Sequence, residues 1–148
     1  MKSPHLKIMA IQEARCTTSL ENYGDTRGAL YNISDADLQF LDNIQNIHFG
    51  KIRPNSIRGN HYHRQGKELL IITYSDVWTL AWAKKDASEI STKKFAGSGS
   101  VLIKIKEGVA HTLKNDGDRD LELIALSNRR FSRISTDAFP RVLIEPGN

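Results

Sequence analysis

The chain has 148 residues, 39% of them hydrophobic, a size that suits one globular core and leaves no room for a second domain. Its net charge of +4 is mild, and the basic residues form short pairs, which argues against nucleic acid as a partner and leaves anionic small molecules open. A single cysteine, Cys16, excludes an internal disulfide and a multi-cysteine zinc cluster.

The N-terminus carries no sign of export. Residues 1–15 contain no apolar run of signal-peptide length, and no stretch elsewhere approaches the roughly 20 apolar residues of a membrane helix. Together with the lone cysteine, this pattern predicts a cytoplasmic protein that does not enter a membrane.

Short segments rich in β-branched and aromatic residues recur along the chain. They predict strands over residues 6–11, 44–52, 69–74, 77–83, 101–105 and 121–127. Turn-forming clusters separate them, at residues 22–25, 53–56, 97–100 and 115–118. Only residues 34–43 predict a helix, a short one with Ser34 or Asp35 as N-cap.

This spacing of short strands predicts an all-β protein, either a barrel or a sandwich. We expect one domain over residues 1–148, with the barrel core at about 6–128 and a C-terminal tail over 129–148. The residues after Phe139 are expected to form a loosely attached terminus.

Three of the five histidines fall in two strand-and-turn blocks. The stretch SIRGNHYH sets His61 and His63 two residues apart, so on a strand both imidazoles point to the same face. Glu68 follows a Gln65-Gly66 turn. In the second block, IKIKEGVAHTLKN, a strand runs into a Glu-Gly turn, which places His111 at the start of the following strand. Antiparallel pairing of the blocks would bring these side chains together inside a barrel.

Three imidazoles and one carboxylate suit a divalent transition metal such as zinc, iron, nickel, manganese or copper. We therefore predict a metal site formed by His61, His63 and His111, with Glu68 as the fourth ligand. The alternative is a surface strand with two histidines and an unrelated structural histidine at position 111.

The two blocks together resemble the paired motifs of the cupin superfamily. The matching residues are Gly59, His61, His63 and Glu68 in the first block, and Gly99, Gly108, His111 and Asn115 in the second. Lys106 stands where cupins usually have proline, which leaves the ligand positions in place. The resemblance implies a double-stranded β-helix, that is, a cupin jelly-roll barrel, and commonly a homodimer.

A narrower resemblance concerns the substrate. GDTRGALYN, residues 24–32, and RGNH, residues 58–61, resemble segments of the cupins that act on nucleotide-linked 4-keto sugars, the 3,5-epimerases and 3,4-ketoisomerases. RGNHYH is also similar to the cupin domain of a capsule-sugar epimerase-reductase. The resemblance implies an isomerase or epimerase of polysaccharide precursor synthesis. Residues 121–133 lack the late-strand tyrosine of the 3,5-epimerases, so a direct 3,5-epimerase is not expected.

The same resemblance implies roles for single residues. His61 would be the base that removes the proton at C3, beside the 4-keto group, and Arg58 would stabilise the resulting oxyanion. Arg27 would hold the diphosphate, since a guanidinium can bind two phosphate oxygens at once, and Asn60 would contact the substrate. Two other functions stay open: a metal-dependent cupin dioxygenase, and a small-molecule-binding cupin without catalysis.

Overall fold

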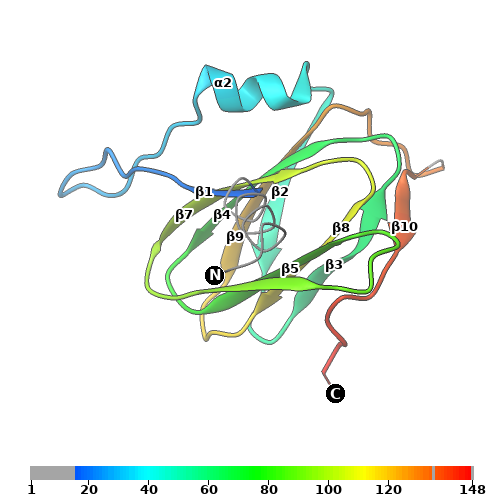
Figure 1. Cartoon of the computed structure of the whole chain (residues 1–148). Helices are drawn as coiled ribbons and strands as arrows, with labels where there is room; N and C mark the ends of the chain where they lie inside the picture. Colours follow the sequence, from blue (N-terminus) through cyan, green and yellow to red (C-terminus); the bar gives the residue numbers. More distant parts are fainter. Residues whose placement is uncertain (1–15, 135, 148) are drawn as a thin grey trace, which may run out of the picture.

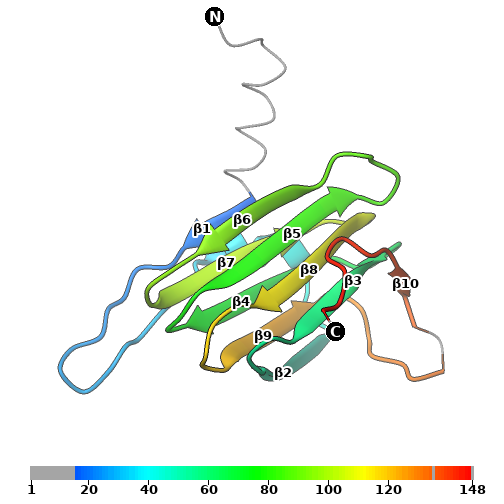
Figure 2. The same ribbon diagram turned by 90° about the horizontal axis from the view of Figure 1, so that it is seen from below.

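The computed structural model describes residues 16–134 and 136–147, so the strand predicted over residues 6–11 lies outside the described part. Two antiparallel sheets of five strands each face one another (Figures 1 and 2). The first has the order β1 (Thr17–Ser19), β7 (Gly99–Ile105), β4 (Glu68–Tyr74), β9 (Leu121–Ser127), β2 (Asn46–Ile52). The second has the order β10 (Ala138–Pro140), β3 (Ile57–His63), β8 (Val109–Asn115), β5 (Trp78–Lys84), β6 (Ser91–Phe95). The predicted all-β jelly roll is confirmed.

The hydrophobic core fills the space between the two sheets. Because side chains alternate along a strand, each central strand buries every second residue there and turns the others outward. This core contains Ile52, Leu70, Ile72, Trp78, Leu80, Phe95, Val101, Ile103, Ile105, Leu113, Leu121 and Ala125. Several core residues come from each sheet, so the core fixes the distance between the sheets and hence the width of any cavity between them.

A short helical segment covers the outer face of the first sheet (Figure 1). Ser34 caps helix α2 (Asp35–Leu38) by accepting a hydrogen bond from the Asp37 N–H at 3.1 Å, and the 3-10 helix η1 (Gln39–Leu41) follows. Helical structure is thus shorter than the predicted 34–43. Leu41 is fully buried in a second cluster, whose other buried members are Leu69, Leu102 and Leu126.

Three strands were not predicted from the sequence. β1 and β10 have three residues each, too few for a periodic pattern. β6 reads STKKF and buries only Phe95, so its composition is that of a charged loop. Each of the three strands lies at an edge of its sheet, where pairing with one neighbour is enough to define a strand.

The prediction of a loosely attached terminus after Phe139 is wrong. β10 pairs with β3, with Phe139 opposite Tyr62. The Arg141 guanidinium then donates hydrogen bonds to the carbonyl oxygens of Lys85 and Ala87, at 2.6 and 2.7 Å. These contacts bind the segment along the second sheet. In the described residues, no helix has the length and apolar character needed to cross a membrane.

Candidate active site

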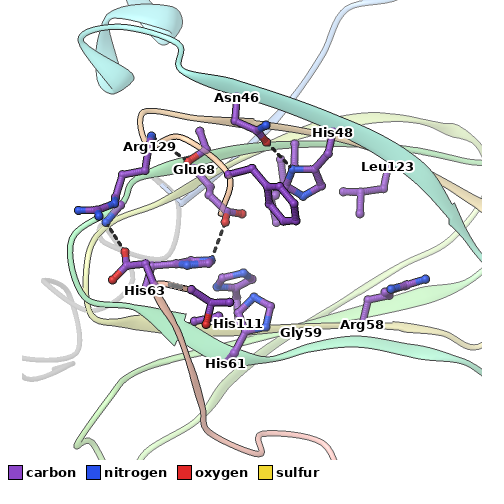
Figure 3. Close-up of a pocket in the computed structure, with 18 of the residues that line it drawn as sticks. Asn46, His48, Arg58, Gly59, His61, His63, Glu68, His111, Leu123 and Arg129 are labelled. Carbon is purple, nitrogen blue, oxygen red and sulfur yellow. Dashed lines mark hydrogen bonds and ion pairs between the residues drawn. The ribbon is translucent and has the colours of Figure 1, made fainter. Parts of the chain in front are cut away.

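A pocket of about 440 Å³ opens between the two sheets (Figure 3). β2, β4 and β9 form one wall, β3 and β8 form the other, and residues 129–138 contribute to its lining. The volume lies within the range of about 300–1,000 Å³ that is usual for small-molecule sites. Its polar lining includes His48, Arg58, His61, His63, Glu68 and His111.

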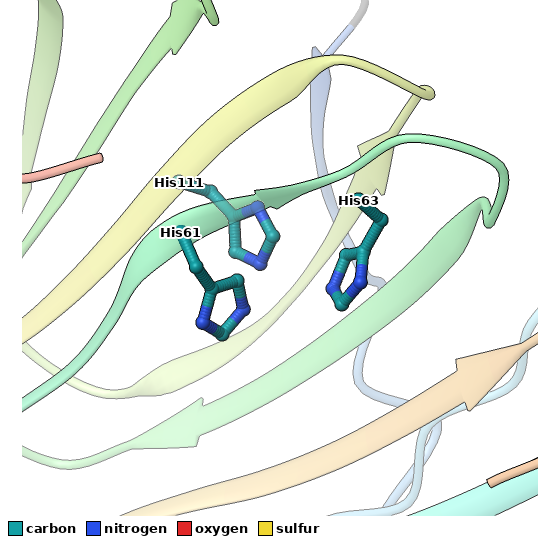
Figure 4. Close-up of side chains that lie close together, drawn as sticks. All are labelled: His61, His63 and His111. Atoms are coloured by element: carbon teal, nitrogen blue, oxygen red, sulfur yellow. The ribbon is translucent and has the colours of Figure 1, made fainter. Parts of the chain in front are cut away.

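Three histidines converge in this pocket (Figure 4). His61 and His63 lie on β3, and His111 lies directly opposite His61 on the paired strand β8. The ring centroid of His61 lies 5.0 Å from that of His63 and 4.8 Å from that of His111. One ring nitrogen from each residue can be chosen so that all three lie within 4.8 Å of one another. The structure thus brings together the three histidines that were predicted from the sequence to share one site.

His111 is the most deeply buried of the three, with 2% of its surface exposed. Its Nδ1 lies 3.2 Å from the Val109 carbonyl oxygen, which can only accept a hydrogen bond. Nδ1 therefore carries the proton, and Nε2 keeps its lone pair. Burial lowers the pKa of His111, so the ring is held neutral in one tautomer, as a metal ligand requires.

His61 and His63 have opposite electrostatic environments although they are close neighbours. Burial, followed by the charges of His111 and His63, lowers the pKa of His61 to about 4. Burial acts on His63 in the same sense, but its contact with Glu68 and the negative charge of that carboxylate outweigh burial and raise the pKa of His63. At neutral pH His61 is therefore unprotonated, whereas Glu68 shifts the pKa of His63 in the opposite direction.

Glu68 lies against His63, with Oε1 2.5 Å from the His63 Nε2 (Figure 3). Burial alone would raise the pKa of Glu68, but the contact with His63 and the charges of the three histidines lower it to about 2. Glu68 is therefore a buried carboxylate that stays ionised. It is held beside one histidine of the cluster, and its role as a fourth metal ligand stays a prediction.

Arg58 lines the pocket, as the proposed role at an oxyanion requires. The structure does not bring Arg27 or Asn60 there. Arg27 lies in the segment between β1 and α2, where its exposed guanidinium pairs with Asp25 at 2.6 Å. The Asn60 side chain is engaged by Thr112 and by the backbone of residues 143 and 144, so it has no place as a substrate ligand.

The pocket also contains residues that the sequence did not single out. His48 lies on β2, with its Nδ1 3.1 Å from the Asn46 side-chain oxygen. Lys51, Arg129 and Arg130 add positive charge to the lining. The strand pattern could have revealed His48, because it lies within the predicted strand 44–52 and two residues after Asn46. The two arginines lie beyond β9, in a segment without a periodic pattern.

The two facing sheets and the histidine cluster in the pocket between them define a cupin. Within this class, the chain belongs to the family described as the polysaccharide biosynthesis C-terminal domain, which matches residues 23–139. No curated protein sequence matches the chain.

Solved structures with the same fold include enzymes of nucleotide-sugar metabolism. The capsular polysaccharide assembling protein CapF from Staphylococcus aureus matches with a TM-score of 0.59 and 21% identity, over 82% of this chain and 34% of CapF. The chain thus spans about a third of the length of CapF. The 3,4-ketoisomerase QdtA from Thermoanaerobacterium thermosaccharolyticum, in complex with TDP, matches with a TM-score of 0.61 and 19% identity, over 83% and 84% of the two chains.

A third structure, the rmlC epimerase from Mycobacterium tuberculosis, matches with a TM-score of 0.66 and 12% identity. The match covers 84% of this chain and 66% of the epimerase. At these identities the likeness shows the fold.

Proposed function

We propose that the chain is an isomerase or epimerase that binds a nucleotide-linked 4-keto sugar in this pocket and acts in polysaccharide precursor synthesis. The observation that carries the proposal is the pair of histidines with opposite pKa shifts, His61 and His63, whose rings lie 5.0 Å apart. Two neighbouring groups whose pKa values are pushed apart are suited to act as base and acid. The family membership and the fold shared with QdtA and the rmlC epimerase support the substrate class.

The proposed reaction begins at the carbon next to the keto group. His61, neutral at pH 7, accepts the C3 proton through its ring lone pair, and the electrons move onto the keto oxygen to give an enediolate. Glu68 raises the pKa of His63, so His63 is the histidine of the pair that is suited to donate a proton to carbon. Delivery to the other face of C3 gives the epimer. Delivery to C4 gives the ketoisomer, provided that the C3 hydroxyl loses its proton and the C4 oxygen gains one.

A pKa of about 4 makes His61 a weak base, so the reaction needs help from stabilisation of the enediolate. Arg58 supplies a fixed positive charge on the same wall of the pocket. Three basic residues line the same pocket and are suited to bind the negatively charged diphosphate: Lys51, Arg129 and Arg130. Glu68 and Asp137 are the carboxylates of this lining.

The histidine cluster also fits a divalent metal ion. Three imidazoles, one of them fixed as the Nε2 donor, and a buried ionised carboxylate are ligands that zinc, iron, nickel or manganese accept. A bound ion would supply Lewis-acid polarisation of a substrate oxygen. However, a neutral His61 has one lone pair, so it cannot bind an ion and accept a proton at the same time.

Because of this competition, we retain a metal-dependent cupin oxygenase as the second candidate function, favoured by the three-histidine cluster. One experiment separates the two functions. The protein is incubated with thymidine- and uridine-linked 4-keto sugars, once after chelation and once after loading with zinc, and the products are followed by NMR. Base catalysis by His61 predicts turnover by the chelated protein and inhibition by zinc. No turnover in either form, with oxygen consumption after loading with iron, would favour the oxygenase.

A further inference from the structure

Arg58 and His61 lie on the same face of β3 although they are three residues apart. Arg58 pairs with Leu113 and His61 pairs with His111, and these two partners are two residues apart on β8. Residues directly opposite one another in an antiparallel pair share a face. In a regular strand, residues three apart would point to opposite sides, and Arg58 would leave the pocket.

A β-bulge restores the common face. The register between β3 and β8 shifts between Gly59 and His61, so that Asn60 is an extra residue without a partner on β8. Both bulge residues have left-handed backbone conformations, with φ of 106° at Gly59 and 56° at Asn60. A Cβ at Gly59 would lie 2.4 Å from the His111 carbonyl oxygen, so the strands approach more closely here than a side chain would allow.

Both the oxygen and the nitrogen of the Asn60 side-chain amide make hydrogen bonds. Its Oδ1 accepts hydrogen bonds from the Thr112 hydroxyl at 2.7 Å and from the backbone N–H groups of Leu143 and Ile144 at 2.9 and 3.2 Å. Its Nδ2 donates to the Ile144 carbonyl oxygen at 3.0 Å. Thr112 is fully buried and adjoins His111, so Asn60 links the strand that carries His61 to the strand that carries His111.

Residues 141–144, which we call the C-terminal strap, are fastened at both the bulge and a neighbouring turn. The Arg141 N–H donates to the Asn60 carbonyl oxygen at 2.8 Å. The Arg141 guanidinium holds the turn between β5 and β6 through the carbonyl oxygens of Lys85 and Ala87. The strap therefore anchors the bulge from outside the barrel, on the side of β3 away from β8.

From these contacts we propose that Asn60 is a positioning residue: its side chain, bound to Thr112 and to the C-terminal strap, holds the bulge that turns Arg58 and His61 into the same pocket. Asn60 is not among the residues that line the pocket. Its effect on catalysis rests on the proposed function, but its effect on the geometry of His61 does not. Loss of the side chain should let β3 relax toward regular pairing, which would rotate His61 away from His111.

Substitution of Asn60 by glycine separates the contribution of the side chain from that of the left-handed backbone conformation. Asn60→Gly tolerates the left-handed φ and removes all four side-chain hydrogen bonds. Asn55→Gly is the matched control, because Asn55 has a φ of 61° in the turn between β2 and β3 and does not line the pocket. Asn60→Asp keeps the acceptor oxygen for Thr112 and the strap, so it serves as the conservative rescue.

The readout is the nuclear Overhauser effect between the ring protons of His61 and His111, whose centroids lie 4.8 Å apart, measured on the chelated protein. We expect this signal in the wild type, Asn55→Gly and Asn60→Asp, and its loss in Asn60→Gly. Circular dichroism establishes that each variant is folded. Persistence of the signal in Asn60→Gly, or its loss in a folded Asn60→Asp, would overturn the proposal.

The same variants separate this inference from the proposed function. If the wild type converts a 4-keto nucleotide sugar, Asn60→Gly should lower kcat more than it raises KM, because the bulge positions the base and not the diphosphate. If the wild type has no activity, the proposed function fails. The ring contact still decides whether Asn60 positions His61.

Discussion

His63 and Glu68 face each other across the turn between β3 and β4, with the His63 Nε2 2.5 Å from the Glu68 Oε1. The three backbone N–H groups of that turn, from Arg64 to Gly66, all donate to the Asp137 carboxylate, at 2.8–3.2 Å. One carboxylate thus fixes the turn, and the turn sets Glu68 against the histidine. Asp137 therefore helps to position the pair of His63 and Glu68, which is the proposed proton donor of the pocket.

The pH dependence of stability should report on His61. Its pKa is lowered from 6.5 to about 4 in the folded protein, so the unfolded chain binds the proton more readily. The neutral ring contributes stability that is fully present above pH 6.5 and is lost as the pH falls toward about 4. Urea unfolding of the chelated protein should show this loss, and His61→Gln should reduce it. His48→Gln, the control, should leave the wild-type slope; an unchanged slope in His61→Gln would contradict the assignment.

Zinc binding should depend on His111. We expect one ion per chain for the wild type, and a loss of affinity in His111→Ala that exceeds the roughly 10- to 100-fold typical of residues that hydrogen-bond to a metal ligand. Isothermal titration calorimetry provides the measurement. His48→Ala is the control, because His48 lines the pocket outside the cluster. Equal zinc affinity in His111→Ala and the wild type would exclude the cluster as the metal site.

Arg58 should affect turnover more than binding. If its charge stabilises the enediolate, Arg58→Ala should lower kcat by about 10²–10³-fold with a smaller change in KM, and Arg58→Lys should recover part of the rate. Arg53→Ala is the matched control, since Arg53 lies in the turn before β3 and does not line the pocket. A pure KM effect in Arg58→Ala would instead assign Arg58 to the diphosphate.

A homodimer is expected from the β2 edge of the first sheet, beside which no further strand lies in the described part of the chain. β2 is an edge strand, and Ile47, Phe49 and Ile124 expose 56%, 80% and 41% of their surface on it and on the neighbouring β9. Light scattering should give twice the chain mass of 16.7 kDa, and Ile47→Glu should shift the mass toward the monomer because it charges this patch without touching the pocket. A monomeric wild type at working concentration would contradict the expectation.

The sequence predicted the fold and the histidine cluster for a common reason. Period-two alternation places His61 and His63 on one face, and the two strand-and-turn blocks supply His111 opposite them. The same rule fails at Asn60, because a bulge adds a residue that alternation cannot anticipate. It therefore could not show that Arg58 shares the pocket or that Asn60 binds the C-terminal strap. Arg27 was assigned from a local motif, and a motif does not specify the distance between its loop and the pocket.

The measurement that tests the central claim most directly is proton exchange at the sugar. Wild type and His61→Ala, both chelated, are incubated in deuterium oxide with thymidine- and uridine-linked 4-keto sugars, and deuterium at C3 is followed by mass spectrometry. We predict incorporation by the wild type and a decrease of about 10²-fold or more in His61→Ala, with nucleotide binding nearly unchanged. Exchange at the wild-type rate in His61→Ala, or binding without any exchange by the wild type, would contradict the assignment of His61 as the base.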